Sequence, residues 1–286
     1  MKICWFNDWR LGTIWEGRLL DVTAALSVLP RATYPAPSGD LLIANLDSVI
    51  DAIDRYVDDA KVVDFADVEF LSPVANPSKI IGVPVNYLKH VEEADANVTI
   101  FTARYQGAIE EQGLFLKATS ALAGFGTGLK LRFPERTNHH EMELGVVIGK
   151  KVNCIDEDQA LNSIAGYTIA LDFVVRGPED RSFRKSIDTY AIVGSWMVTA
   201  DEIEDPQNLE FELRVNGELR QRSNTRAMIM KIARQISWAS QFYTLWPGDI
   251  FMTGTCEGVG PVVPGDVVDC EIEKVGAGRL LVSAAV

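Results

Sequence analysis

The chain has 286 residues, of which 47% are hydrophobic, and its formal net charge is −13. This size allows a full buried core, in one large domain or in a small domain plus a larger one. The negative charge disfavours nucleic acids and anionic membranes as partners, because both repel an acidic surface.

The start of the chain and its cysteines indicate a cytoplasmic protein. No apolar stretch approaches the roughly 20 residues that span a bilayer, and the first ten residues lack the apolar core of a signal peptide. Four cysteines (Cys4, Cys154, Cys256 and Cys270) have neither CxxC spacing nor the density of a disulfide scaffold. They are interpreted as free thiols in a reducing compartment, without structural zinc.

Residues 1–72 are predicted to form a small unit and residues 73–286 a larger one. The small unit has strand signals around a turn in residues 9–23. An amphipathic helix is predicted over residues 46–58, with apolar side chains at helical spacing. The proline-punctuated segment 71–79 is the predicted joint.

Residues 79–87 are predicted to form a strand that ends at a turn, followed by a helix that carries His90 and Glu93. Positions three apart share a helix face, so the pair could act as a dyad in which the carboxylate orients a histidine that takes a proton from water. A surface helix with an inert histidine would have the same spacing. Residues 94–113 follow and are interpreted as a mobile cover or a surface loop.

Two lysines, Lys117 and Lys185, lie among apolar residues. Either could bind a substrate carboxylate or a developing enolate, although most lysines only solvate a surface. The segment 124–130, GFGTGLK, lacks the spacing of a phosphate loop and is interpreted as an ordinary loop. Serine-hydrolase and zincin signatures are absent.

Three carboxylates are predicted to hold one hard cation. In NHHEMELGVVIGK, Glu141 and Glu143 point to the same side of a strand, because side chains alternate faces. Asp172 lies in an almost wholly apolar run, where an ionised carboxylate is costly unless a cation or several donors compensate it. The two glutamates could instead form a solvated face, and Asp172 could cap a turn or pair with Arg176.

The C-terminal half is predicted to be mostly β. Asn216 and Gly217 form a hairpin turn, and Pro-Gly-Asp turns at 247–249 and 264–266 each precede a strand. A helix is predicted over about 225–243, with Met228, Ile232, Ile236 and Phe242 on one face.

From about Lys79 to Gly276 the chain resembles the fumarylacetoacetate hydrolase family, and in particular its acylpyruvase and oxaloacetate decarboxylase branch. The segments that carry the resemblance, in the order in which the family shows them, are KIIGVPVNYLKHVEE, LFLKATSAL, HHEMELGVVIGK, AGYTIALDFVVRG, RVNGELRQRSNTRAMI, PGDIFMTGTCEGVG and PGDVVDCEIEKVG. The resemblance implies an α+β, mostly β fold. A mixed β-sandwich or β-roll catalytic domain would follow a small N-terminal α+β domain.

The resemblance also implies roles for individual residues. Glu141, Glu143 and Asp172 would hold Mg²⁺ or Mn²⁺; His90 and Glu93 would activate water from a closing lid; Lys185 and Thr255 would contact substrate; Arg176 and Lys117 would help to bind the substrate acid. A homodimer is the expected assembly.

The implied reaction is the metal-dependent hydrolysis of a C–C bond in an acylpyruvate, a 2,4-dioxo acid, to pyruvate and a carboxylic acid. The alternatives on the same scaffold are decarboxylation of oxaloacetate, hydration of a 2-oxo-alkenoate, and isomerisation. A protein of another class, which binds a metal or a small acid without turnover, would keep the carboxylates.

Four positions depart from the usual family pattern. Pro84 and Gly177 stand where Gly and Asp are usual, Glu179 where a glutamine often contacts substrate, and Cys256 where a proline is common. The segment between His90 and Lys117 is also longer than usual. These departures put the substrate pocket in doubt.

Overall fold

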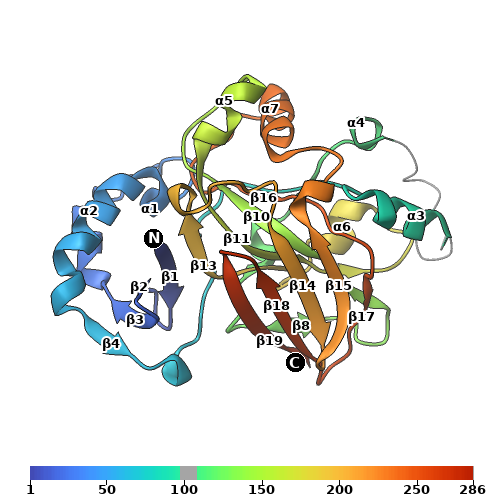
Figure 1. The fold of residues 1–286 in the computed structure, drawn as a ribbon, viewed down its shortest axis with the longest axis horizontal. Helices are drawn as coiled ribbons and strands as arrows, with labels where there is room; N and C mark the ends of the chain where they lie inside the picture. Colours follow the sequence, from blue (N-terminus) through green and yellow to red (C-terminus); the bar gives the residue numbers. More distant parts are fainter. Residues whose placement is uncertain (97–107, 286) are drawn as a thin grey trace.

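The computed structural model describes residues 1–96 and 108–285, which are rich in β-strands and carry only short helices (Figure 1). The described strands form sheets of 11, three and five strands. The expected α+β, mostly β fold class is confirmed.

The 11-stranded sheet runs through the whole molecule. Its strands are β1 (Lys2–Phe6), β2 (Arg10–Trp15), β3 (Arg18–Asp21), β4 (Lys61–Val63), β5 (Ile80–Gly82), β6 (Phe115–Lys117), β7 (Leu122–Ala123), β10 (Met142–Ile148), β11 (Ile164–Asp172), β13 (Ala191–Thr199) and β16 (Ile250–Met252). Their order is β4-β3-β2-β1-β13-β11-β10-β16-β5-β6, and β7 pairs with β13.

The two smaller sheets lie in the C-terminal part. One has the order β12-β9-β17 and the other β15-β14-β18-β19-β8. Their strands are β8 (Leu129–Leu131), β9 (Asn138–His140), β12 (Val174–Val175), β14 (Glu210–Val215), β15 (Glu218–Asn224), β17 (Gly260–Pro261), β18 (Val267–Ile272) and β19 (Gly276–Ala284). The predicted hairpin joins β14 to β15, and both of its turn residues, Asn216 and Gly217, have positive φ angles of 51° and 81°.

The described helices are short. They are α1 (Leu41–Ala44), α2 (Leu46–Tyr56), α3 (Leu88–Ala96), α4 (Ile109–Gln112), α5 (Glu157–Ala160), α6 (Arg181–Lys185) and α7 (Ile232–Phe242). None of the described helices is long and apolar enough to cross a membrane.

The two sequence-based helix predictions had different outcomes. The helix at 46–58 is confirmed as α2, with Val49 and Ile53 fully buried. The helix at 225–243 is wrong at its start, because Asn224 caps a separate 3₁₀ turn and Met228 has an extended backbone. Helix α7 begins only at Ile232, and Phe242 lies exposed at its end.

The N-terminal unit joins the larger sheet through backbone pairing. Strand β1 pairs with β13, with Lys2 opposite Val198. In Figure 1 the blue segment with α1 and α2 lies on one side of this junction and the remaining sheets on the other. The division into domains 1–72 and 73–286 stays a prediction.

Strands β10 and β11 lie at the centre of the large sheet and are buried along their whole lengths. Met142, Leu144 and Val146 belong to the main apolar cluster. One face of β10 is therefore core, as predicted, and Glu143 lies on the opposite face, where Val147 packs in a second apolar cluster. Glu141 directly precedes the strand. The sheet thus fixes where the site lies.

Candidate active site

Three buried carboxylates meet where β10 and β11 pair. One oxygen atom from each of Glu141, Glu143 and Asp172 lies within 4.8 Å of the others. Met142 lies opposite Leu171 in the ladder, and the Asp172 N–H donates to the Glu141 carbonyl oxygen at 2.9 Å. Asp172 is therefore opposite Glu141 and points to the same side of the sheet, as directly opposed residues do.

Cations surround two of these carboxylates. Lys185 Nζ binds Glu141 Oε2 at 2.5 Å and also binds Asp172 Oδ2. Lys117 donates to Asp172 and, at 2.8 Å, to the carbonyl oxygen of Tyr190. Burial lowers the pKa of Lys117, against the pull of Asp172. Lys117 Nζ holds Asp172 in place through its hydrogen bond in this structure, and its expected contact with substrate stays a prediction.

Glu141 and Glu143 have opposite electrostatic settings. Burial opposes the charge on Glu141, but Lys185 and Arg176 outweigh it and hold its pKa well below the ordinary value. Burial first, and then the charge of Asp172, raises the pKa of Glu143 well above the ordinary value. Among the described residues, the hydrogen bond to its side chain comes from the Gly254 N–H, at 2.6 Å.

The carboxylate set fits a hard divalent cation. All three ligand groups offer oxygen atoms, the kind that Mg²⁺ and Mn²⁺ prefer. Glu143 has a raised pKa, and a nearby cation would supply the positive charge that favours its ionised form. The alternative of a solvated face is wrong, since Glu141 and Glu143 are 6% and 2% exposed.

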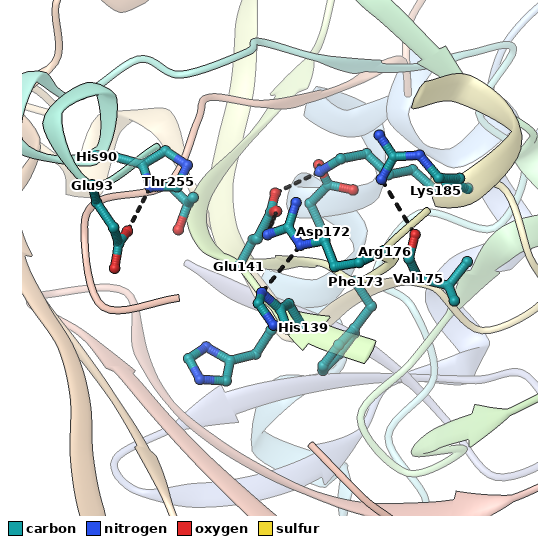
Figure 2. A network of polar contacts seen from close by, with 12 residues as sticks. His90, Glu93, His139, Glu141, Asp172, Phe173, Val175, Arg176, Lys185 and Thr255 are labelled. Carbon is teal, nitrogen blue, oxygen red and sulfur yellow. Dashed lines mark hydrogen bonds and ion pairs between the residues drawn. The ribbon is translucent and has the colours of Figure 1, made fainter. Parts of the chain in front are cut away.

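The predicted dyad forms on helix α3. His90 Nδ1 lies 2.9 Å from Glu93 Oε2, and His90 is only 3% exposed. A carboxylate accepts hydrogen bonds, so the proton of the neutral ring lies on Nδ1 and Nε2 can accept a proton. Figure 2 shows this pair facing Glu141 and Asp172, with Thr255 beside it.

Arg176 links the acidic cluster to a histidine that sequence reasoning missed. Its Nη2 donates to Glu141 Oε1 at 3.0 Å, and its Nε donates to His139 Nδ1 at 3.1 Å (Figure 2). Burial and the Arg176 charge lower the pKa of His139 to about 3, which keeps the ring neutral and able to accept this bond. The two histidines before Glu141 were the available signal.

Thr255 is held against β10. Its Oγ1 donates to the Met142 carbonyl oxygen at 2.8 Å and accepts from Gln221 Nε2 at 2.7 Å. Gln221 is a second residue that sequence reasoning missed. The expected contact of Thr255 with substrate stays a prediction.

Two of the family departures form one structural unit. Arg136 makes a bidentate pair with Glu179, with both distances 2.9 Å, and also donates to the Arg176 carbonyl oxygen. A Cβ on Gly177 would lie 2.1 Å from Arg136 Nη2. The glycine thus leaves room for the arginine, and the arginine engages Glu179.

The other two departures, Pro84 and Cys256, are both buried. Burial raises the pKa of Cys256 to about 12, so its thiol stays protonated near neutral pH. Pro84 lies in the turn between β5 and α3.

Much of the predicted cover over residues 94–113 lies outside the described residues, namely residues 97–107. At the far end of the cover, Gln112 accepts a hydrogen bond from Arg181 at 2.9 Å.

Comparisons with known proteins show which family the chain belongs to. Residues 79–282 match the family model described as fumarylacetoacetate hydrolase C-terminal. A maleylpyruvate hydrolase of Aquipseudomonas alcaligenes is 50% identical over 278 residues, which cover 96% of this chain and 97% of that protein. A mitochondrial oxaloacetate tautomerase of Xenopus laevis is 34% identical, over 91% of this chain and 81% of that protein.

A solved structure is similar along the whole chain. The maleylpyruvate hydrolase from Sphingobium sp. SYK-6, crystallised with manganese(II) and pyruvate, has a TM-score of 0.85 and 37% identity, and the match covers 100% of both chains.

Proposed function

The chain belongs to the fumarylacetoacetate hydrolase family, and from this premise we propose that it is a metal-dependent hydrolase that cleaves a C–C bond of an acylpyruvate. The products are pyruvate and a carboxylic acid. The observation that carries the proposal is the buried carboxylate cluster faced by the His90–Glu93 pair. Of the acylpyruvates, we propose maleylpyruvate as the substrate, because the relative with this activity matches almost the full length of both chains.

Glu141, Glu143 and Asp172 are the proposed ligands of Mg²⁺ or Mn²⁺. A bound cation would supply positive charge that stabilises the negative charge developing on the substrate oxygen atoms. Lys185, which bridges Glu141 and Asp172, adds a second positive charge at the same place.

His90 is the proposed general base. Glu93 accepts the Nδ1–H, so Nε2 takes a proton from water as the oxygen attacks the distal carbonyl carbon. The C–C bond then breaks, and its electron pair leaves with the pyruvate enolate. That carbon regains a proton from His90, so one water molecule is consumed and the atoms balance.

Arg176, Lys117 and Thr255 are the proposed contacts for the substrate acid. The assignment is best supported for Arg176, because its guanidinium group lies beside Glu141 in the cluster. Lys117 also holds Asp172 in place, and Thr255 also holds the Met142 backbone.

A tautomerase is the second candidate, favoured by the similarity to the Xenopus laevis protein. Moving a proton within oxaloacetate would use the same cluster without the attack of water. Hydrolysis requires His90, so a His90→Ala variant with full turnover on the true substrate would support the tautomerase.

We further propose a cytoplasmic homodimer. The family resemblance supports the dimer, and the four cysteines, all free thiols in the structure, fit a reducing compartment. Sedimentation velocity that shows only a monomer would overturn the dimer.

The test is a panel of acylpyruvates that includes maleylpyruvate, with and without Mg²⁺ or Mn²⁺. The diketo-enol absorbance of each compound is followed, pyruvate is measured with lactate dehydrogenase, and Glu141→Ala is the control. Metal-dependent loss of absorbance with stoichiometric pyruvate supports the proposal. Loss of absorbance without pyruvate contradicts it.

A further inference from the structure

Gln221 is a buried glutamine in β15, a strand that belongs to the five-stranded sheet and not to the sheet of the metal cluster. Leu213 pairs with Gln221 but Arg214 pairs with Leu219, so Arg220 is an extra residue in β15. Such a bulge redirects the side chains around it. Here Leu219 is 38% exposed whereas Gln221 is 1% exposed.

The amide oxygen of Gln221 holds the backbone between two metal ligands. Oε1 accepts from the Met142 N–H at 3.0 Å and lies 2.9 Å from His140 Nδ1. The orientation of the amide is unambiguous, because Met142 N–H can only donate and the carbonyl at the other end can only accept. Met142 lies between Glu141 and Glu143, so this bond bears on both carboxylates.

The amide nitrogen of Gln221 holds the loop after β16. Nε2 donates to Thr255 Oγ1 at 2.7 Å and to the Cys256 carbonyl oxygen at 3.1 Å. Thr255 Oγ1 in turn donates to the Met142 carbonyl oxygen at 2.8 Å. Gln221, Thr255 and Met142 therefore form a closed ring of hydrogen bonds. In this ring both the N–H and the carbonyl oxygen of Met142 have a partner.

The same loop reaches the dyad. The Gly258 N–H donates to Glu93 Oε1 at 3.1 Å, while Glu93 Oε2 contacts His90. A Cβ on Gly258 would lie 2.0 Å from the Arg220 carbonyl oxygen, and its φ angle is +89°. The loop therefore packs directly on the bulge of β15. The close approach of the Arg220 carbonyl leaves room only for glycine at position 258.

We propose that Gln221 is a positioning residue that sets the metal-binding strand and the His90–Glu93 pair at their working separation. It joins the two through Met142 on one side and the 255–258 loop on the other. The alternative is a buried amide that only satisfies nearby polar groups. The assignment rests on the proposed function for its catalytic consequence, but its effects on the loop and on metal affinity do not depend on the substrate.

The test compares Gln221→Met, which removes all the hydrogen bonds, with Gln221→Glu, which keeps the shape and the acceptor oxygen. Gln207 supplies matched controls, Gln207→Met and Gln207→Glu. It is a partly buried glutamine that also bonds the backbone, donating to the Thr225 carbonyl oxygen at 3.0 Å and accepting from Ile232 N–H at 2.6 Å. The measurements are Tm, Mn²⁺ affinity by calorimetry, kcat and KM, and hydrogen exchange of the peptide that contains Gly258.

Both Gln221 variants are expected to lower Mn²⁺ affinity or kcat by about 10- to 100-fold, as loss of a group that orients metal ligands does. Exchange at Gly258 should speed up, and KM should change less than kcat. The Gln207 variants should lower Tm without these changes. If Gln221→Met does not fold, Gln221→Glu gives the same comparison.

A double-mutant cycle with Thr255→Val sharpens the test. If Gln221 acts through Thr255, the effects of the two substitutions on kcat should be clearly less than additive. Folded Gln221 variants with unchanged metal affinity, kcat and Gly258 exchange would overturn the proposal. Absence of acylpyruvate turnover by the parent chain would refute the proposed function, while the metal-affinity and exchange data would still decide the role of Gln221.

Discussion

The carboxylate cluster of Glu141, Glu143 and Asp172 and the His90–Glu93 pair face each other but are built differently (Figure 2). The carboxylates belong to central strands of the large sheet, and lysines and an arginine balance their charge. The dyad belongs to the short helix α3, and Glu93 is tied to the rest of the protein by Gly258 N–H. The cluster is therefore fixed by central strands, whereas the pair is held on a short helix by polar contacts that include the Gly258 N–H. The two parts should respond differently to substitution.

The largest effect is expected in the cluster. Asp172→Asn should abolish tight Mn²⁺ binding and lower kcat/KM by about 10³-fold or more, because a bound metal is worth several kcal/mol of charge stabilisation. It also leaves Lys117 and Lys185 without their shared counter-charge. Breaking a buried pair in this way costs about 3–5 kcal/mol of unfolding free energy. Calorimetry and chemical denaturation measure the two effects.

Glu143→Gln is the matched comparison. It should also lose the metal, but the metal-free protein should be no less stable than the parent, because burial already disfavours the charged form of Glu143. Equal destabilisation by Glu143→Gln and Asp172→Asn would contradict the described charge balance.

The next effect is expected in the dyad. His90→Ala should lower kcat by about 10² to 10⁴-fold, the usual contribution of a general base, and leave Mn²⁺ affinity unchanged. Steady-state kinetics and metal titration of the same preparation check this. A loss of metal affinity equal to that of Asp172→Asn would show that the two parts are not separate.

A smaller effect is expected at the Arg136–Glu179 pair. Gly177→Asp would bring a side chain against Arg136 and displace it from Glu179. The change in kcat/KM should stay below about tenfold, because a partly exposed pair contributes little. Arg136→Ala should reproduce the effect, and a loss clearly above tenfold, or different effects of the two substitutions, would contradict this prediction.

The smallest effect concerns Cys256. Because its pKa is raised to about 12, only about one thiol in 10⁴ is ionised at pH 8. Iodoacetamide at pH 8 should modify the exposed Cys154 and leave Cys256 and activity intact, as peptide mass spectrometry would show. Sensitivity should appear only as the pH approaches 12. Rapid modification of Cys256 at pH 8 would contradict its burial.

The parts of the site that follow local periodicity could be predicted from the sequence. Glu141 and Glu143 share a strand face because side chains alternate, and an aspartate in an apolar run predicts a buried charge. His90 and Glu93 meet because positions three apart share a helix face. These predictions need only a few neighbouring residues.

The supporting residues could not be predicted in this way. Lys117 reaches Asp172 across 55 residues, and Gln221 reaches Met142 across 79. The bulge at Arg220 also reverses the alternation in β15, so that a leucine is exposed and a glutamine is buried. Tertiary packing decides such contacts, and local patterns do not encode them. The late start of α7 has a local cause instead, the turn capped by Asn224 inside an apolar pattern.

Hydrolysis of the C–C bond by water is best tested by turnover of maleylpyruvate in ¹⁸O-labelled water with Mn²⁺. The proposed hydrolysis predicts stoichiometric pyruvate and one ¹⁸O atom in the carboxylate formed at the cleaved bond, with both lost in EDTA or in the His90→Ala variant. Conversion of the substrate without pyruvate, or pyruvate whose partner acid lacks the label, would contradict the account.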